Sequence, residues 1–144
     1  MNVEHSVIID CPPQVVFSVY KDVGSWPEWD PDIEAVHLEG EFAAGSKGWL
    51  KPVGAPKTAT TMLQVVDNQS FIVESSLPLC KMRFEHELEP IGDKTKATHR
   101  VIFTGIAAPV FSRLVSGKIN KTIDSTMQSL KNFSETLQAQ SAKS

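Results

Sequence analysis

Two histidines, His86 and His99, are the residues of this 144-residue chain best suited to acid–base chemistry. The even-numbered residues of segment 80–88 are apolar apart from His86, and the odd-numbered residues of segment 97–103 are apolar apart from His99. A period of two is typical of β-strands with one buried face. Each strand therefore places one imidazole on an apolar face, where a group that titrates near neutral pH could take up or release a proton.

The turn at residues 90–93 connects these two strands. We predict an antiparallel register in which His86 lies opposite His99, because every inward residue then meets another inward residue. The flanking pairs in this register are Phe84 with Val101 and Leu88 with Ala97. His5 has the same parity on an N-terminal strand and could bring a third imidazole to the patch.

Three interpretations of these histidines stay open. They could be separate structural side chains, or a polar patch that orients a ligand or exchanges a proton in an apolar pocket. Three histidines could also bind zinc, but the sequence places no carboxylate to support such ligands. We therefore predict catalytic or polar roles for His86 and His99 and no metal site.

Other chemical motifs are missing. Segment 40–47 resembles a phosphate-binding loop, but its last two residues stand in the reverse order and a strand-like segment ending in Pro52 follows in place of a helix. No nucleophile elbow is found either. We expect no cofactor.

Composition limits the class of partner. The formal net charge is -3 and basic residues are interspersed with acidic ones, which argues against nucleic acid. No apolar run approaches the length of about 18 residues that a membrane span needs. The N-terminus shows no leader pattern and the two cysteines lack metal spacing, so we expect a cytoplasmic protein with reduced thiols.

Residues 26–31, with the sequence WPEWDP, predict a corner in the chain. Neither a long helix nor a central strand could run through its two prolines. Its tryptophans carry a large apolar area and each indole N–H needs an acceptor, so we expect the corner to close one end of a hydrophobic interior. Trp29 could serve there as a core residue or contact a ligand.

The remaining pattern describes an α+β domain spanning residues 1–144. Alternation at 3–9 predicts a first strand, and residues 13–21 predict a short helix that begins at prolines. Short turns separate six further candidate strands, which favours an antiparallel meander: 33–38, 46–51, 58–66, 70–76, 80–88 and 95–104. An apolar stripe predicts one long helix over about 109–137, with frayed residues from 138 onward.

These segments resemble a known family. Ile9-Asp10-Cys11-Pro12 at a strand end, the helical segment 15–20, the WPEWDP corner, Gly45-Ser46 and the segment 105–130 are similar to the polyketide cyclase/dehydrase branch of the START/Bet v 1-like (SRPBCC) superfamily, over about residues 3–137. The resemblance implies a helix-grip fold: a curved seven-stranded antiparallel sheet wrapped around a long C-terminal helix, with two short helices after the first strand. It also implies a hydrophobic cavity that holds lipids, polyketides or other apolar molecules.

The superfamily mixes carriers, cyclases and other activities, so function depends on the cavity residues. The leading hypothesis is binding of a small hydrophobic or amphipathic ligand between the sheet and the long helix. The alternatives are a cyclase or dehydratase in which His86 or His99 acts as general acid or base, and a protein-interaction module. We expect a monomer or weak homodimer. The predicted ligand-binding residues are Trp29, Trp49, Phe71, Met82, Phe84, Val101, Phe103, Phe111, Leu114 and Val115.

Overall fold

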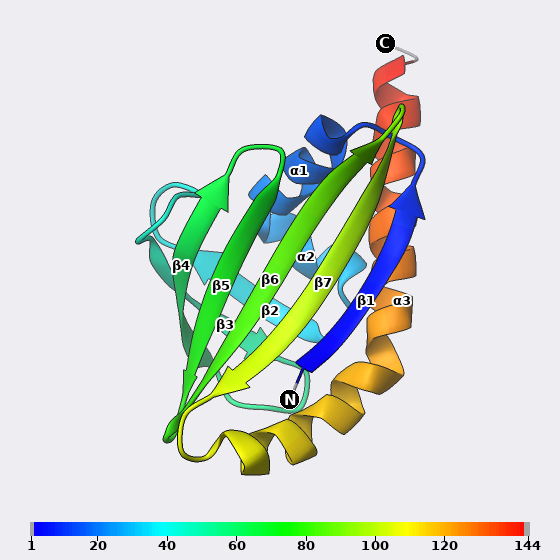
Figure 1. Ribbon diagram of the computed structural model, residues 1–144. Coiled ribbons are helices and arrows are strands. Elements are labelled where there is room, and N and C mark those ends of the chain that lie inside the picture. Colours follow the sequence, from blue (N-terminus) through cyan, green and yellow to red (C-terminus); the bar gives the residue numbers. More distant parts are fainter. Residues whose placement is uncertain (1, 143–144) are drawn as a thin grey trace.

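The computed structural model describes residues 2–142 of the chain (Figure 1). The first elements are strand β1 (Asn2–Ile9), helix α1 (Pro13–Lys21), the 3-10 turn η1 (Val23–Ser25) and the short helix α2 (Trp26–Trp29). The remaining elements are β2 (Ile33–Leu38), β3 (Lys47–Pro52), β4 (Thr58–Val66), β5 (Ser70–Leu77), β6 (Cys80–Ile91), β7 (Lys94–Thr104) and α3 (Ala108–Ala142).

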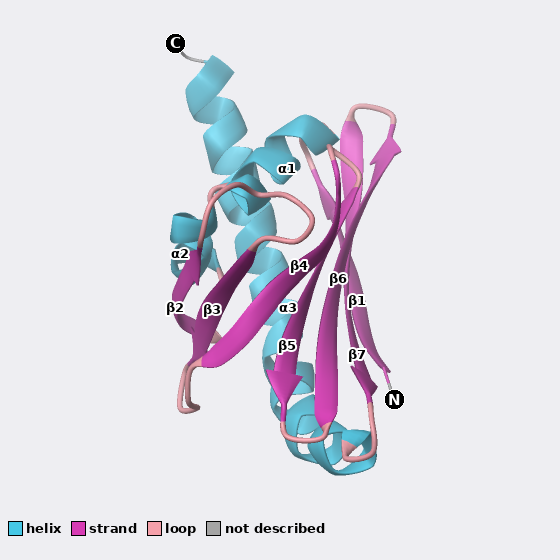
Figure 2. Cartoon of the chain, turned by 90° about the vertical axis from the view of Figure 1, so that its left-hand side faces the viewer, coloured by secondary structure: helices cyan, strands magenta, loops and turns pink. Residues whose placement is uncertain are grey.

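The seven strands form one antiparallel sheet in the order β1-β7-β6-β5-β4-β3-β2. Figure 2 shows that the sheet is strongly curved and that the helices lie on its concave side. Helix α3 packs along β1 and also touches β7, β6, α1 and α2. The structure therefore confirms the predicted helix-grip α+β fold, including the two short helices after β1.

The predicted register of β6 and β7 is also confirmed. His86 pairs with His99, Phe84 with Val101, and Leu88 with Ala97. The hairpin is longer than predicted, because β6 continues to Ile91 and β7 begins at Lys94. Gly92 makes this two-residue turn possible, since its positive φ of 63° is a backbone conformation that most residues avoid.

The core joins α1, α2 and α3 to the concave face of the sheet. Helix α1 buries Val16, Phe17, Val19 and Tyr20, all on the side facing the sheet. Both tryptophans of the 26–31 corner are buried, and the Trp26 indole N–H donates to the Tyr20 carbonyl oxygen at 2.9 Å. The corner therefore closes the interior, as its composition indicated.

Helix α3 differs from the prediction at two places. It extends to Ala142, so residues 138–142, which were expected to fray, are helical. Leu114 was expected to face the interior but is 71% exposed. Phe111, Val115 and Ile119 form the inward stripe, and Leu114 lies beside Val110 on the outward flank of the same turns.

Candidate functional site

The two predicted histidines meet on the concave face of the sheet. Their ring centroids are 4.6 Å apart, with the planes at 74°. Tyr20 reaches this pair from α1, and its hydroxyl lies 2.7 Å from the His99 Nε2 atom. A helix and two strands thus build a polar network in an apolar interior, with Tyr20 and His99 buried and His86 partly buried.

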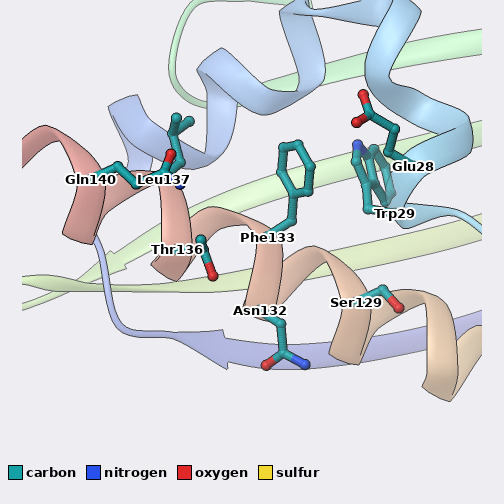
Figure 3. A pocket seen from close by; sticks show the side chains of 8 residues that line it. All are labelled: Glu28, Trp29, Ser129, Asn132, Phe133, Thr136, Leu137 and Gln140. Atoms are coloured by element: carbon teal, nitrogen blue, oxygen red, sulfur yellow. The ribbon is translucent and has the colours of Figure 1, made fainter.

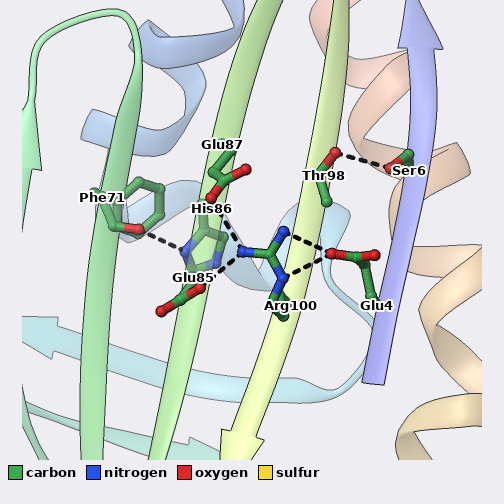
Figure 4. A network of polar contacts seen from close by, with 8 residues as sticks. All are labelled: Glu4, Ser6, Phe71, Glu85, His86, Glu87, Thr98 and Arg100. Carbon is green, nitrogen blue, oxygen red and sulfur yellow. Dashed lines mark hydrogen bonds and ion pairs between the residues drawn. The ribbon is translucent and has the colours of Figure 1, made fainter. Parts of the chain in front are cut away.

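His86 is held in place by its neighbour on β5. Its ring stacks on Phe71, with centroids 3.9 Å apart and planes at 4°. Its Nδ1 atom lies 3.3 Å from the Phe71 carbonyl oxygen, an interaction drawn in Figure 4. Because a carbonyl oxygen only accepts, His86 carries its proton on Nδ1.

Burial makes the network electrically neutral. It lowers the pKa of His86 to about 4, although hydrogen bonds with the backbone of Phe71 and Phe84 act in the opposite direction. The pKa of His99 also lies well below its ordinary value, mainly because of burial and then because of His86. Burial raises the pKa of Tyr20. At neutral pH the three side chains are uncharged. They can donate or accept hydrogen bonds, but they offer no charge to a ligand.

His5 does not join this pair. It lies opposite His99 in the backbone register of β1 and β7, as its parity indicated. Its ring turns to α3 instead, where Nε2 lies 2.7 Å from a carboxylate oxygen of Asp124. Within residues 2–142, no three His, Cys, Asp or Glu side chains are arranged to hold a metal ion.

The concave face is incompletely covered beneath the first half of α3. Met82, Phe84 and His86 point inward from β6, a central strand, and yet are only partly buried. Phe111, Val115 and Ile119 on α3 are also partly buried and pack against the same core. We call the apolar members of this set the open face: Met82, Phe84, Phe111, Val115 and Ile119.

The cavity predicted between the sheet and the long helix matches neither of two pockets found in the described part of the chain. One is an interior space of about 20 Å³ between the η1–α2 corner and strands β2 to β5. Around the histidines, the rings of Tyr20, Phe71 and Trp29 occupy the interior. Tyr20 fills this region because α1 directs its large side chain onto the middle of the sheet.

The other pocket is a groove of about 360 Å³ between α2 and the second half of α3. Figure 3 shows Phe133 pointing from α3 toward α2, where it lies beside Trp29. The Trp29 indole nitrogen is buried without a hydrogen-bond partner in the described part of the chain. The groove is lined by Glu28, Trp29, Ser129, Asn132, Phe133, Thr136, Leu137 and Gln140.

The other predicted binding residues lie in different places. Val101, Phe103 and Phe71 are buried in the core. Trp49 lies on the outer face of β3, where its ring is 6.1 Å from that of His37 and the Lys57 Nζ atom is 3.9 Å from its centroid. The adjacent Leu50 takes the inward position on β3, so Trp49 does not lie with the other predicted ligand-binding residues.

Sequence reasoning missed Tyr20 and Asp30. Tyr20 is the only tyrosine of the chain and belongs to the apolar side of α1, so its burial was foreseeable and its contact with His99 was not. Burial raises the pKa of Asp30 to about 6. A hydrogen bond that the carboxylate accepts from the Asp32 backbone N–H, at 2.9 Å, acts in the opposite direction. No sequence motif marks this carboxyl group.

A family model described as polyketide cyclase/dehydrase and lipid transport matches residues 1–135. The chain belongs to the polyketide cyclase/dehydrase and lipid transport family. This confirms the resemblance drawn from the strand end, the tryptophan corner and the long helix. The comparison with curated proteins found no match.

Solved structures share the fold of this family member. The Zhui aromatase/cyclase from Streptomyces sp. R1128 is similar over 94% of this chain and 93% of its own, with 16% identity and a TM-score of 0.75. A START superfamily protein from Mycobacterium smegmatis (94% and 98% covered, 16% identity) and Ara h 8.0201 (94% and 98% covered, 14% identity) each give a TM-score of 0.73. At such identities the likeness concerns the fold alone.

No helix among residues 2–142 has the length and apolarity to cross a membrane.

Proposed function

We propose that this family member binds a small hydrophobic or amphipathic molecule on the open face, with the polar end of the molecule directed to His86. The observation that carries the proposal is the partial exposure of Met82, Phe84 and His86 on the inner face of a central strand. Inner residues of both neighbouring strands, such as Val73 and Val101, are buried. An apolar guest would complete the burial of this strip.

The polar groups favour an uncharged polar end on the ligand. The neutral His86 ring gives its Nδ1 proton to the Phe71 carbonyl oxygen, so its Nε2 atom can accept a hydrogen bond from a ligand hydroxyl but offers no counter-charge to a carboxylate. The one arginine on β7, Arg100, lies on the outer face and is held by Glu4, Glu85 and Glu87 (Figure 4). A sterol-like, aromatic or ketide-like molecule that carries a hydroxyl group fits these conditions better than a fatty-acid anion.

A dye-binding experiment tests the site. We expect the protein to bind an apolar fluorescent dye and Val115→Trp to weaken that binding about tenfold or more, because the indole would occupy the open face. Ile102→Trp is the matched control, since Ile102 alternates with the inward residues Val101 and Phe103 and so lies on the outer face. Equal affinities in all three proteins, or no binding by the wild type, would remove the proposal.

The Tyr20–His99–His86 network favours a second candidate, a cyclase or dehydratase that moves protons through these groups. The pKa of His86, about 4, makes this imidazole a weak base at neutral pH, which is why binding comes first. A bound β-hydroxyketone would be returned unchanged by a carrier, whereas an enzyme would convert it to the enone and water. Loss of conversion in His86→Gln, with dye binding retained, would identify the enzyme.

We also propose that the protein works in the cytoplasm as a monomer or weak homodimer, with the small hydrophobic molecule as its partner. Cys11 and Cys80 are both buried and unpaired, which suits a reducing compartment. Burial raises the pKa of the Cys11 thiol to about 11, so the thiol stays protonated at neutral pH and serves as a packed core group, not as a nucleophile. Size-exclusion chromatography with light scattering over a range of concentrations measures the oligomeric state.

A further inference from the structure

One end of the molecule carries a cluster of large, exposed apolar side chains. They come from the β5–β6 turn, from the β7–α3 connection and from the first turns of α3, at the lower end of Figure 1. Their exposed fractions are higher than those of the other large apolar residues that reach the surface of the described chain. We call this set the apolar tip: Leu79 (72%), Ile106 (87%), Val110 (59%) and Leu114 (71%).

The backbone fixes the parts of the tip to one another. The Ala107 N–H donates to the Leu79 carbonyl oxygen at 2.9 Å. Gly105 has a φ of +108°, and a Cβ atom there would lie 2.8 Å from the same oxygen. This close approach requires glycine and brings the two loops together. The tip is therefore a defined surface made by two segments that are distant in sequence.

The same end of the molecule is basic. Segments 77–83 and 104–123 together hold five basic residues and no acidic residue, whereas the rest of the chain holds nine basic and seventeen acidic residues. Glu74 partly balances Lys81 and Arg83. Arg113 and Lys121 on α3 form no ion pair within the described residues 2–142. An acidic protein thus has a basic end with apolar side chains protruding from it.

We propose that this end docks on a membrane surface that contains anionic lipids. Protruding apolar side chains can enter the interface of a bilayer while surrounding lysine and arginine residues attract the headgroups. A second copy of this chain would place like charges against each other. Nucleic acid would match the basic residues and leave the apolar side chains unused.

The position of the tip would connect docking to ligand exchange. Val110 and Leu114 occupy the outer side of the same helical turns whose inner side carries Phe111 and Val115 of the open face. Docking would bring the open face to the bilayer, from which an apolar ligand could enter. This consequence rests on the proposed function, whereas docking itself does not.

Co-sedimentation with vesicles tests the docking. We expect binding to phosphatidylcholine vesicles with about 30% phosphatidylserine, and binding about tenfold weaker to pure phosphatidylcholine. The double variant Arg113→Glu, Lys121→Glu should lose at least about thirtyfold in affinity, because losing each basic residue costs roughly 1 kcal/mol and each new carboxylate is repelled by the anionic headgroups. Lys94→Glu, Lys96→Glu is the matched control, because both lysines are exposed at the opposite end of the sheet.

A second pair of variants tests the apolar contribution. Val110→Ser, Leu114→Ser should weaken binding to the anionic vesicles, and Ile8→Ser, Ile91→Ser should leave it as in the wild type. Ile8 and Ile91 are 45% and 46% exposed near the opposite end. All four variants should keep their cooperative unfolding, since none removes a core side chain.

Several results would overturn the proposal. They are the absence of vesicle binding, equal binding to neutral and anionic vesicles, and losses in the control variants as large as those at the tip. A dimer that Leu114→Ser dissociates would assign the tip to a second copy and overturn it as well. Dye binding in vesicle-free solution should be the same in all tip variants, so failure of docking and failure of the interior site are distinguishable.

Discussion

His86 and His99 lie directly opposite each other on β6 and β7, with their ring centroids 4.6 Å apart. Two neighbouring imidazoles in an apolar interior cannot both be charged at low cost, and burial disfavours the charge on each. The pair is therefore a neutral polar feature at neutral pH. Tyr20 completes its hydrogen bonding from the helical side.

The first prediction concerns the pH dependence of stability. The pKa of His86 is lowered to about 4, so between about pH 4 and 6.5 the unfolded chain binds more protons than the folded chain. The free energy of unfolding should therefore fall as the pH drops through this window, and His99 should add to the fall. Urea denaturation at several pH values measures it.

His86→Phe should reduce this slope while preserving the ring stacked on Phe71. NMR titration of the wild-type imidazoles gives the direct measurement. Normal titration of both rings near pH 6.5 would contradict the buried pair.

The second prediction concerns the Tyr20 hydroxyl. Tyr20→Phe keeps the ring but removes the group 2.7 Å from the His99 Nε2 atom, leaving a buried polar atom unpaired. We expect a loss of about 1–3 kcal/mol in the free energy of unfolding. A double-mutant cycle with His99→Phe isolates the coupling, because the loss should shrink when the imidazole is already gone. Additive effects would show that the contact contributes nothing to stability.

The third prediction compares two leucines of α3. Leu130 is fully buried, whereas Leu114 is 71% exposed. Leu130→Ala should cost about 2–5 kcal/mol through lost burial and the cavity left behind. Leu114→Ala on the same helix should stay within about 0.5 kcal/mol. Equal melting temperatures for the two variants would mean that the inward stripe has been misplaced.

The fold could be predicted from the sequence because local patterns agreed with one another. The alternation in 80–88 and 97–103, read with the turn between them, left one register in which all inward residues meet, and that register is present. The period change near residue 109 located α3. Parity and period depend on neighbours along the chain, so a single sequence carries them.

The candidate site was less predictable because it depends on choices that these patterns leave open. Trp49 and Leu50 are adjacent large apolar residues on one strand, and parity alone does not decide which of them faces inward. Around Leu114 apolar residues occur on more than one side of the helix. The sequence alone therefore does not decide whether the inward stripe runs through Phe111 and Val115 or through Val110 and Leu114. The place of Tyr20 depends on where α1 rests on the sheet, which is a tertiary property.

The last prediction concerns Asp30, which follows the buried Trp29. Burial raises the pKa of its carboxyl group to about 6, and the nearby Asp32 charge acts in the same direction. The folded chain therefore holds a proton that the unfolded chain has already lost between about pH 4 and 6. The stability that the protonated Asp30 contributes is fully present below the pKa of the unfolded chain. It is lost as the pH rises through the pKa of the folded chain.

Asp30→Asn should then stabilise the protein more at pH 7.5 than at pH 4.5, because it removes a buried charge that exists only at the higher pH. The amide oxygen can still accept the hydrogen bond from the Asp32 N–H. Urea denaturation at the two pH values measures the difference, with Asp67→Asn in the exposed β4–β5 turn as the reference for losing one charge. A gain in stability that is the same at both pH values would show that the Asp30 carboxyl group is not held protonated by burial.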